Sequence, residues 1–171
     1  MSFQAARPLD AWNWLIVPGL VCLAASLILA IPVRVFGFGL PEPVFVLVPT
    51  FVWAVVRPSI LPPIILFGLG ICLDLIWGGT LGVWPLSILM GYTAVLATRA
   101  IAGGQGREAN WIWFGLMCLL VELVAFLITV VSTHVIPNLV AAGWQWLVTI
   151  ALYPVAHRLI ERFEDTDVRY R

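Results

Sequence analysis

Long runs of apolar residues alternate with short polar clusters along this chain. Six such runs cover residues 12–33, 40–56, 60–77, 83–99, 111–133 and 137–158. A membrane-spanning helix needs roughly 20 mainly apolar residues, and most of the runs reach or approach that length. The pattern therefore predicts an all-α, polytopic integral membrane protein, with six transmembrane helices that form a single domain over residues 1–171.

The second run has an alternative interpretation. Between Glu42 and Arg57 the apolar stretch is too short to cross about 30 Å of hydrocarbon at about 1.5 Å per residue, unless residues 40–43 join it. Otherwise it is a re-entrant segment. The arginines favour a full span, because six spans leave only Arg34 outside, whereas five would separate the C-terminal arginines from the N-terminus. We therefore expect six spans with both termini cytoplasmic.

Composition supports the membrane assignment and excludes other classes. Hydrophobic residues make up 62% of the chain and charged residues 11%, and the mean hydropathy is +1.04. Soluble domains are about 45–50% apolar and about 25% charged. The net charge is +0 and there is no lysine, so the basic surface of a nucleic-acid-binding protein is missing. The first run is too long for the core of a signal peptide, so we expect it to be retained as the first helix.

Residues that carry metal or catalytic chemistry are few. Cys22, Cys72 and Cys118 fall inside apolar runs without metal-ligand or redox spacing, which is typical of packing. His134 and His157 belong to opposite membrane faces in the six-span arrangement and so cannot hold one metal ion together. No nucleophile with an adjacent base and no catalytic motif is present. We therefore expect a protein that is not an enzyme and that holds no metal or cofactor.

Small and polar residues at three- and four-residue spacing mark the faces through which membrane helices pack. Four predicted helices carry such a stripe: Gly19, Cys22, Ser26 and Ala30 in the first; Gly70, Asp74 and Gly78 in the third; Ser87, Gly91, Ala94 and Thr98 in the fourth; and Gly115, Cys118, Glu122, Ala125, Thr129 and Ser132 in the fifth. We expect these four helices to form the packed core. Five prolines in or next to the runs predict kinks: Pro49, Pro62, Pro63, Pro85 and Pro154.

Glu122 lies near the middle of the fifth predicted helix, where a carboxylate is costly. No arginine within the predicted spans can pair with it, so we expect it to be protonated and hydrogen-bonded to Tyr92, Gln145 or the backbone of a partner. Glu122 either makes a structural hydrogen bond between helices or takes part in a proton relay or a ligand contact. The structural interpretation is favoured, because relays usually show a chain of ionisable groups and only Asp74 is available as another.

Asp74 lies about one turn from the outer end of the third predicted helix. It is followed by a glycine-rich turn that contains Gly78, Gly79 and Gly82. Two roles remain open at this level. The carboxylate either caps or pins this turn, or it contacts a ligand or partner.

Residues 57–92 read RPSILPPIILFGLGICLDLIWGGTLGVWPLSILMGY. This segment, about a fifth of the chain, resembles the signature segment of the bacterial rod shape-determining protein MreD family. The matching residues are Arg57, Pro58, Pro62, Pro63, Gly68, Gly70, Asp74, Gly79, Leu81, Gly82 and Tyr92. Cys72 and Leu73 depart from the pair of leucines that is common before the aspartate.

The resemblance implies a non-catalytic inner-membrane subunit of the bacterial cell-elongation complex, which scaffolds or regulates side-wall peptidoglycan synthesis and rod cell shape. Its implied partners are MreC, a single-span protein with a large periplasmic part, and through MreC the peptidoglycan glycosyltransferase and the penicillin-binding transpeptidase. The family also resembles in fold the substrate-binding components of energy-coupling-factor transporters. The alternative function is therefore a small-molecule-binding subunit of a membrane transporter.

Under the first hypothesis the candidate residues make contacts rather than perform chemistry. Asp74 and the turn at residues 78–82 would order the periplasmic face, and Arg57, Pro58 and Pro62 the cytoplasmic turn. Tyr92 and Glu122 complete the set of candidate partner or structural residues.

Overall fold

The computed structural model describes residues 15–29, 34–35, 38–39, 42–56, 59–102 and 107–168. These residues form seven helices and one short antiparallel hairpin. In chain order the elements are α1 (Val17–Leu29), β1 (Arg34–Val35), β2 (Phe38–Gly39), α2 (Leu47–Val56), α3 (Leu61–Trp77), α4 (Val83–Ala102), α5 (Arg107–Thr133), α6 (Leu139–Ile150) and α7 (Tyr153–Val168). The predicted all-α class is confirmed for this part of the chain, with the hairpin as an addition.

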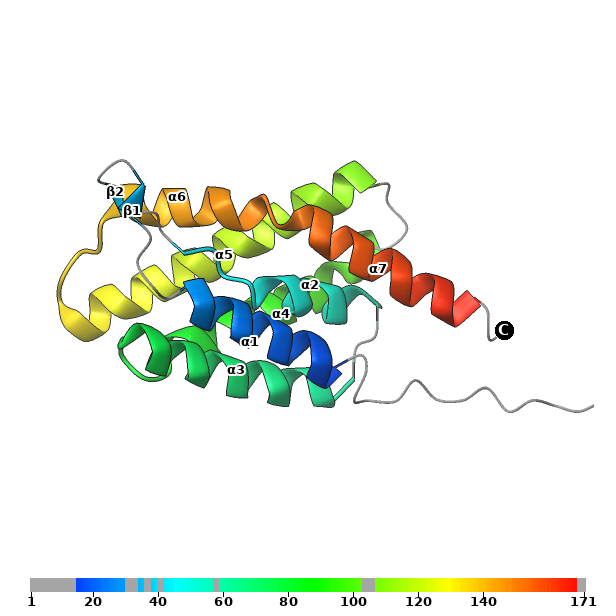
Figure 1. The fold of residues 1–171 in the computed structure, drawn as a ribbon, viewed down its shortest axis with the longest axis horizontal. Coiled ribbons are helices and arrows are strands. Elements are labelled where there is room, and N and C mark those ends of the chain that lie inside the picture. Colours follow the sequence, from blue (N-terminus) through cyan, green and yellow to red (C-terminus); the bar gives the residue numbers. More distant parts are fainter. Residues whose placement is uncertain are drawn as a thin grey trace, which may run out of the picture.

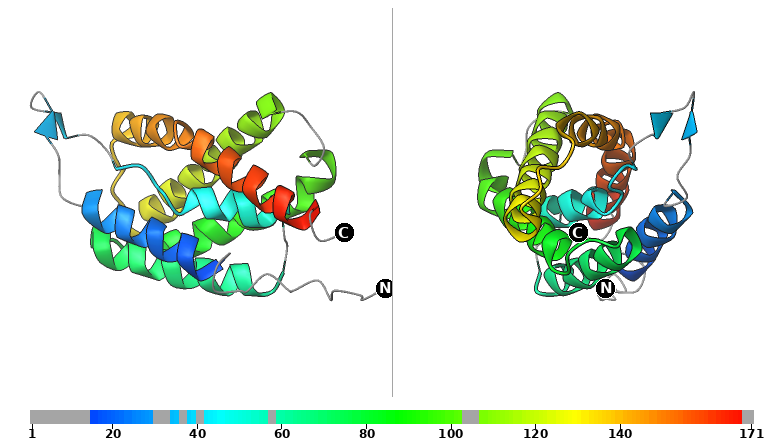
Figure 2. Two further views of the ribbon diagram at one scale, coloured as in Figure 1. Left: turned by 45° about the vertical axis from the view of Figure 1, so that its right-hand side comes forward. Right: turned by 90° about the vertical axis from the view of Figure 1, so that its left-hand side faces the viewer.

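The helices run along one common axis, and consecutive helices reverse direction (Figure 1). The exception is the pair α6 and α7, which continue each other across a two-residue turn at Ala151 and Leu152. The start of α1 and the end of α7 lie at the same end of the bundle, and the β1–β2 hairpin lies at the other (Figure 2).

Two stretches are long and apolar enough to cross a membrane, judged by length and composition. They are Glu108–Thr133, which is most of α5, and Leu139–Glu161, which joins α6 to the first half of α7. Only 33% and 17% of their most apolar windows are buried in the molecule, so these stretches differ from the core helices of a soluble protein. Other helices also expose large apolar side chains: Ile28, Ile64, Leu75 and Leu86. Such a surface suits contact with lipid better than contact with water.

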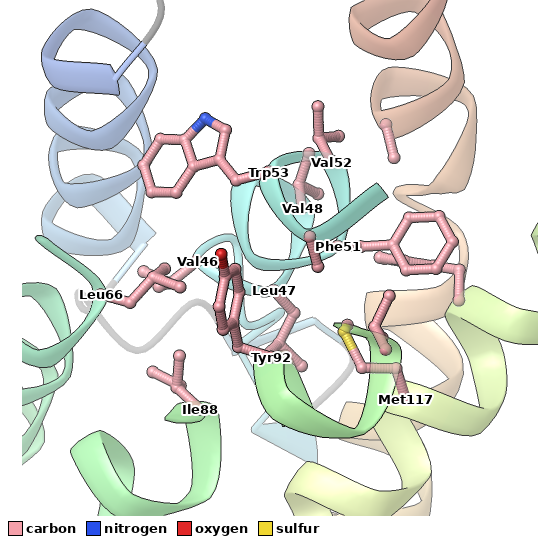
Figure 3. Close-up of a cluster of buried hydrophobic side chains, with 14 of the residues drawn as sticks. Val46, Leu47, Val48, Phe51, Val52, Trp53, Leu66, Ile88, Tyr92 and Met117 are labelled. Atoms are coloured by element: carbon pink, nitrogen blue, oxygen red, sulfur yellow. The ribbon is translucent and has the colours of Figure 1, made fainter. Parts of the chain in front are cut away.

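The helix α2 lies at the centre of the bundle, against α4 and α7. Eight of its ten residues are buried. Trp53, Phe51 and Val52 extend from it toward different neighbours (Figure 3), and the rings of Phe51 and Phe114 meet edge to face at 5.4 Å. The four predicted core helices did not include α2, because a helix that is apolar on all sides shows no stripe of small or polar residues. The helix α1, which was among the four predicted core helices, packs chiefly on α3.

The second apolar run forms a shorter helix than predicted, because residues 42–46 are not helical. The backbone N–H of Val44 donates to Thr149 Oγ1 at 3.1 Å instead of to a helical carbonyl. That hydroxyl in turn donates to the Gln145 carbonyl at 2.7 Å. Val44 and Val46 are fully buried, so this non-helical segment is part of the core.

All five prolines for which kinks were predicted lie in the first turn of a helix. Pro49 is in α2, Pro62 and Pro63 in α3, Pro85 in α4 and Pro154 in α7. The N–H groups of a first turn have no partner within the helix, so proline is tolerated there without bending it. The expected kinks are therefore helix starts, and Pro154 marks the place where the last predicted span divides into α6 and α7.

Two glycines let the helices α3, α4 and α5 approach closely. A Cβ atom on Gly70 of α3 would lie 2.6 Å from the backbone of Pro85 in α4. A Cβ atom on Gly91 of α4 would collide with the Val121 side chain of α5. Both residues belong to the stripes predicted from the sequence, which here face neighbouring helices as expected.

Candidate functional site

The Asp74 carboxylate is held against the start of α4. Its Oδ2 accepts a hydrogen bond from the Gly82 N–H at 2.6 Å, and its Oδ1 accepts one from the Trp84 N–H at 3.1 Å. The side chain is only 1% exposed. The first N–H groups of a helix lack intrahelical partners and carry partial positive charge, so a carboxylate there is stabilising. Asp74 thus caps α4 from the preceding helix.

The backbone of the same residue closes α3. The Asp74 carbonyl accepts from the N–H groups of Gly78 and Gly79. Gly78 has φ +65° and Gly82 has φ +100°, values that favour glycine because a Cβ atom would be strained there. Gly79 has no such φ, and a Cβ atom on it would meet nothing within 4 Å. Of the two roles left open for Asp74, these bonds match the capping of the turn.

A second carboxylate extends this arrangement. Glu42 Oε2 accepts a hydrogen bond from the indole N–H of Trp77 at 2.7 Å. The Trp77 ring packs edge to face on Trp84, with centroids 4.8 Å apart. Because the Trp84 backbone also bonds to Asp74, one network joins the non-helical segment before α2 to the α3–α4 turn. We call the set Glu42, Asp74, Trp77, Gly78, Gly82 and Trp84 the outer-turn network.

Glu42 was not predicted as a site residue. The available signal was its position, since a lone acid between Pro41 and Pro43 precedes an apolar run that is too short for a helical span. That the tryptophan partner lies 35 residues away could not be read from local pattern.

The other residues of the MreD-like segment lie elsewhere. Pro62 is buried in the first turn of α3, at the opposite end of that helix from Asp74. Tyr92 is 2% exposed and lies in the core beside Val46 and Leu66 (Figure 3). Arg57 and Pro58 lie outside the described residues. The outer-turn network therefore contains Asp74, Gly78 and Gly82 of the predicted set, whereas Pro62 and Tyr92 support the packing of the helices.

Glu122 is separate from this network. It lies near the middle of the 27-residue helix α5, and its Oε1 atom is buried without a hydrogen-bond partner in the described part of the chain. Neither Tyr92 nor Gln145, two of the three partners expected for it, donates to this atom. The third expectation, the backbone of a partner, stays a prediction.

The arrangement offers structure rather than reactive groups. Among the described residues, no three His, Cys, Asp or Glu side chains lie close enough to hold a metal ion. Cys22, Cys72 and Cys118 are free thiols. His157 pairs with Glu161 at 3.1 Å on α7, and His134 lies just after α5 with φ +54°.

Comparison with known proteins adds no relative. No family model matches the chain, and neither a curated protein nor a solved structure is detectably similar to it. The likeness to MreD therefore depends on residues 57–92 alone.

Proposed function

We propose that this chain is an inner-membrane protein that crosses the bilayer six times, with both termini cytoplasmic. In this arrangement residues 42–46 and α2 together make the second crossing, and α6 and α7 together make the sixth. The alternating helix directions and the outward-facing apolar side chains support it. Non-helical backbone at membrane depth is tolerated where protein surrounds it, which suits the fully buried Val44 and Val46.

We further propose that the chain is a non-catalytic subunit of the bacterial cell-elongation complex. It would scaffold or regulate side-wall peptidoglycan synthesis and rod shape through MreC, and through MreC the glycosyltransferase and the transpeptidase. The observation that carries the proposal is the outer-turn network. Three residues of the MreD-like region, Asp74, Gly78 and Gly82, fix one exposed turn in one conformation. A rigid turn without reactive groups suits a protein that holds partners.

The transporter alternative has one observation in its favour, since interrupted membrane helices often line substrate sites. Here, however, the interruptions are filled. Thr149 satisfies the backbone of Val44, and prolines occupy the first turns of α2 and α7. Two hollows in the described structure, on α5 and α6, are apolar and include neither Asp74 nor Glu122. We therefore rank the scaffold function first.

Depletion of the protein in its own bacterium tests the proposal. Cells should lose their rod shape and become round, and the wild-type chain should restore them. The tagged chain should also retain MreC through purification in mild detergent. Normal rods after depletion, together with no retained MreC, would rule the function out.

A matched pair of variants connects the phenotype to the outer turn. Asp74→Leu removes both hydrogen-bond acceptors for the start of α4, whereas Gly79→Ala adds a methyl group in open space on the same turn. The first variant should fail to restore rods and the second should restore them. Equal rescue by both variants would show that the hydrogen bonds of Asp74 in the outer turn are not needed for rod shape.

A further inference from the structure

The helices α6 and α7 lie end to end (Figure 1), but the bundle holds them unequally. No residue from 139 to 148 is buried, and α6 packs chiefly on α5. In α7, by contrast, Tyr153, Ala156 and Ile160 are buried, and that helix packs chiefly on α2. Elements with few buried contacts separate from a protein at the lowest free-energy cost. The boundary between the loosely held and the firmly held part falls just after Thr149, which is completely buried.

The turn between the two helices, at Ala151 and Leu152, has the properties of a hinge. Pro154 has no N–H group, so the helical hydrogen bond that would join it to the Ile150 carbonyl cannot form. The N–H of Val155 instead donates to the Leu152 carbonyl at 2.9 Å, so α7 begins its own hydrogen bonds within the turn. Rotation at this turn therefore leaves the helical hydrogen bonds of both helices in place.

The start of α6 is likewise independent of the bundle. The Asn138 Oδ1 atom accepts from the N–H groups of Val140 and Ala141 at 3.0 and 3.4 Å, so α6 is capped by its own preceding residue. The chain that leads to it, residues 131–136, consists entirely of exposed residues. The helix α6 is thus a capped unit between an exposed connection and a hinge, which is the arrangement of an element that moves as a rigid body.

One side-chain hydrogen bond joins α6 to its neighbour. The indole N–H of Trp146 donates to the Gly115 carbonyl of α5 at 3.1 Å. Gly115 lies inside α5, where carbonyl groups also accept from the helix backbone, so the loss of this bond leaves α5 intact. A hollow of about 260 Å³ lies beside the bond, with Leu116 and Ile150 in its walls. The Trp146 ring therefore has space in which to move.

We propose that α6 is a movable helix that swings about the turn at Ala151 and Leu152, and that the Trp146–Gly115 hydrogen bond holds it in the packed position. The swing separates α6 from α5 and leaves α7 on α2. Another molecule that contacts residues 134–138 would shift this equilibrium, so the hinge is a route by which an event at that end of the bundle reaches its middle. The inference does not depend on the elongation function.

Distances between nitroxide labels test the swing in the full chain, reconstituted in lipid nanodiscs. The labels are attached through p-acetylphenylalanine, which leaves the native cysteines in place. One pair joins Val140 of α6 to Leu75 of α3, and the control pair joins Val155 of α7 to Ile64 of α3; all four side chains are exposed. Pulsed electron paramagnetic resonance should show a main distance and a second population of about 1–10% for the first pair. The control pair should show a single distance.

Three variants test the hinge and the bond. Trp146→Phe keeps a ring but removes the donor, and should raise the second population about three- to tenfold, the range for one interhelical hydrogen bond. Trp144→Phe is the matched control, because Trp144 is exposed and makes no hydrogen bond among the described residues; the population should not change. Pro154→Ala supplies the missing N–H, and should lower the population because a continuous helix resists bending.

A single, equally narrow distance for both pairs, unchanged in Trp146→Phe, would overturn the proposal. A broad distribution for the control pair as well would also overturn it, because the whole bundle would then be mobile rather than α6 alone. Equal effects of Trp144→Phe and Trp146→Phe would remove the role of the hydrogen bond. Loss or retention of MreC in the depletion and purification experiments leaves these distances unaffected, so the two proposals fail independently.

Discussion

Asp74 Oδ2 lies 2.6 Å from the backbone nitrogen of Gly82, so a side chain of α3 accepts a hydrogen bond from the residue that precedes α4. The same residue ends its own helix through its carbonyl. One residue thereby fixes both the exit from α3 and the entry to α4. The predictions below follow from this turn and from the packing beneath it.

Asp74→Leu should destabilise the protein by about 2 kcal/mol, because two partly buried N–H groups, of Gly82 and Trp84, lose their acceptor. Asp74→Asn keeps one acceptor oxygen and should cost about half as much. Thermal unfolding in detergent, followed by circular dichroism, measures both. In a pull-down of MreC, Asp74→Leu should also be more damaging than Glu122→Gln. Equal losses in the pull-down would contradict the assignment of a neutral Glu122.

The three glycines of the turn should respond differently to alanine. Gly78→Ala and Gly82→Ala should each lower stability by about 1–2 kcal/mol, because both positions have positive φ. Gly79→Ala should lie within about 0.5 kcal/mol of the wild type, since its Cβ would point into open space. The same unfolding measurement applies to all three. A cost at Gly79 that matches the cost at Gly82 would show that backbone conformation is not the cause.

Gly70 and Gly68 form a matched pair on α3. Gly70→Ala should destabilise the bundle by about 1–3 kcal/mol, because the added methyl would meet the Pro85 backbone, which cannot move as a side chain can. Gly68→Ala should be neutral or stabilising by up to about 1 kcal/mol, since alanine favours a helix and nothing lies near the new atom. Resistance to unfolding in mixed detergent micelles ranks the two variants. If Gly68→Ala were the more destabilising variant, the close contact between α3 and α4 would not lie at Gly70.

Variants of Thr149 test the non-helical segment before α2. Thr149→Val keeps the shape of the side chain but removes the acceptor for the Val44 N–H, and should cost about 1–3 kcal/mol. Thr149→Ser keeps the hydroxyl and should lose clearly less. Hydrogen exchange at the Val44 amide provides a local readout, with faster exchange expected in the valine variant. Unchanged exchange would mean that the bond with Thr149 does not hold the segment.

The fold was predictable where local chemistry sets it. The end of α3 and the start of α4 could be located because Gly78, Gly82 and Pro85 signal turns within a few residues of each other. The non-helical path of residues 42–46 could not, because the bond that holds the Val44 N–H comes from a hydroxyl 105 residues away. Long-range satisfaction of a backbone group leaves no periodic trace in the sequence around it.

The candidate site was likewise predictable where the signal is local and not where it depends on long-range contacts. Asp74 and its glycines were identified from spacing, and capping was one of the two roles expected. Glu42 was missed, because only the folded chain brings its carboxylate to Trp77. Glu122 was recognised from its charge in an apolar run, although its missing internal partner became evident only in three dimensions.

The shortness of α2 has an effect on the opposite side of the bundle. In the half that α2 occupies, a full helical cylinder fills the centre, and α7 rests on it. In the other half the chain before α2 forms the turns of residues 42–46, in which Val44 and Val46 are completely buried. On this side, residues 139–148 of α6 include none that is buried, and Thr149 makes the bond to Val44. Packing is therefore dense around α2, where eight of ten residues are buried, and looser around the first turns of α6, where none is.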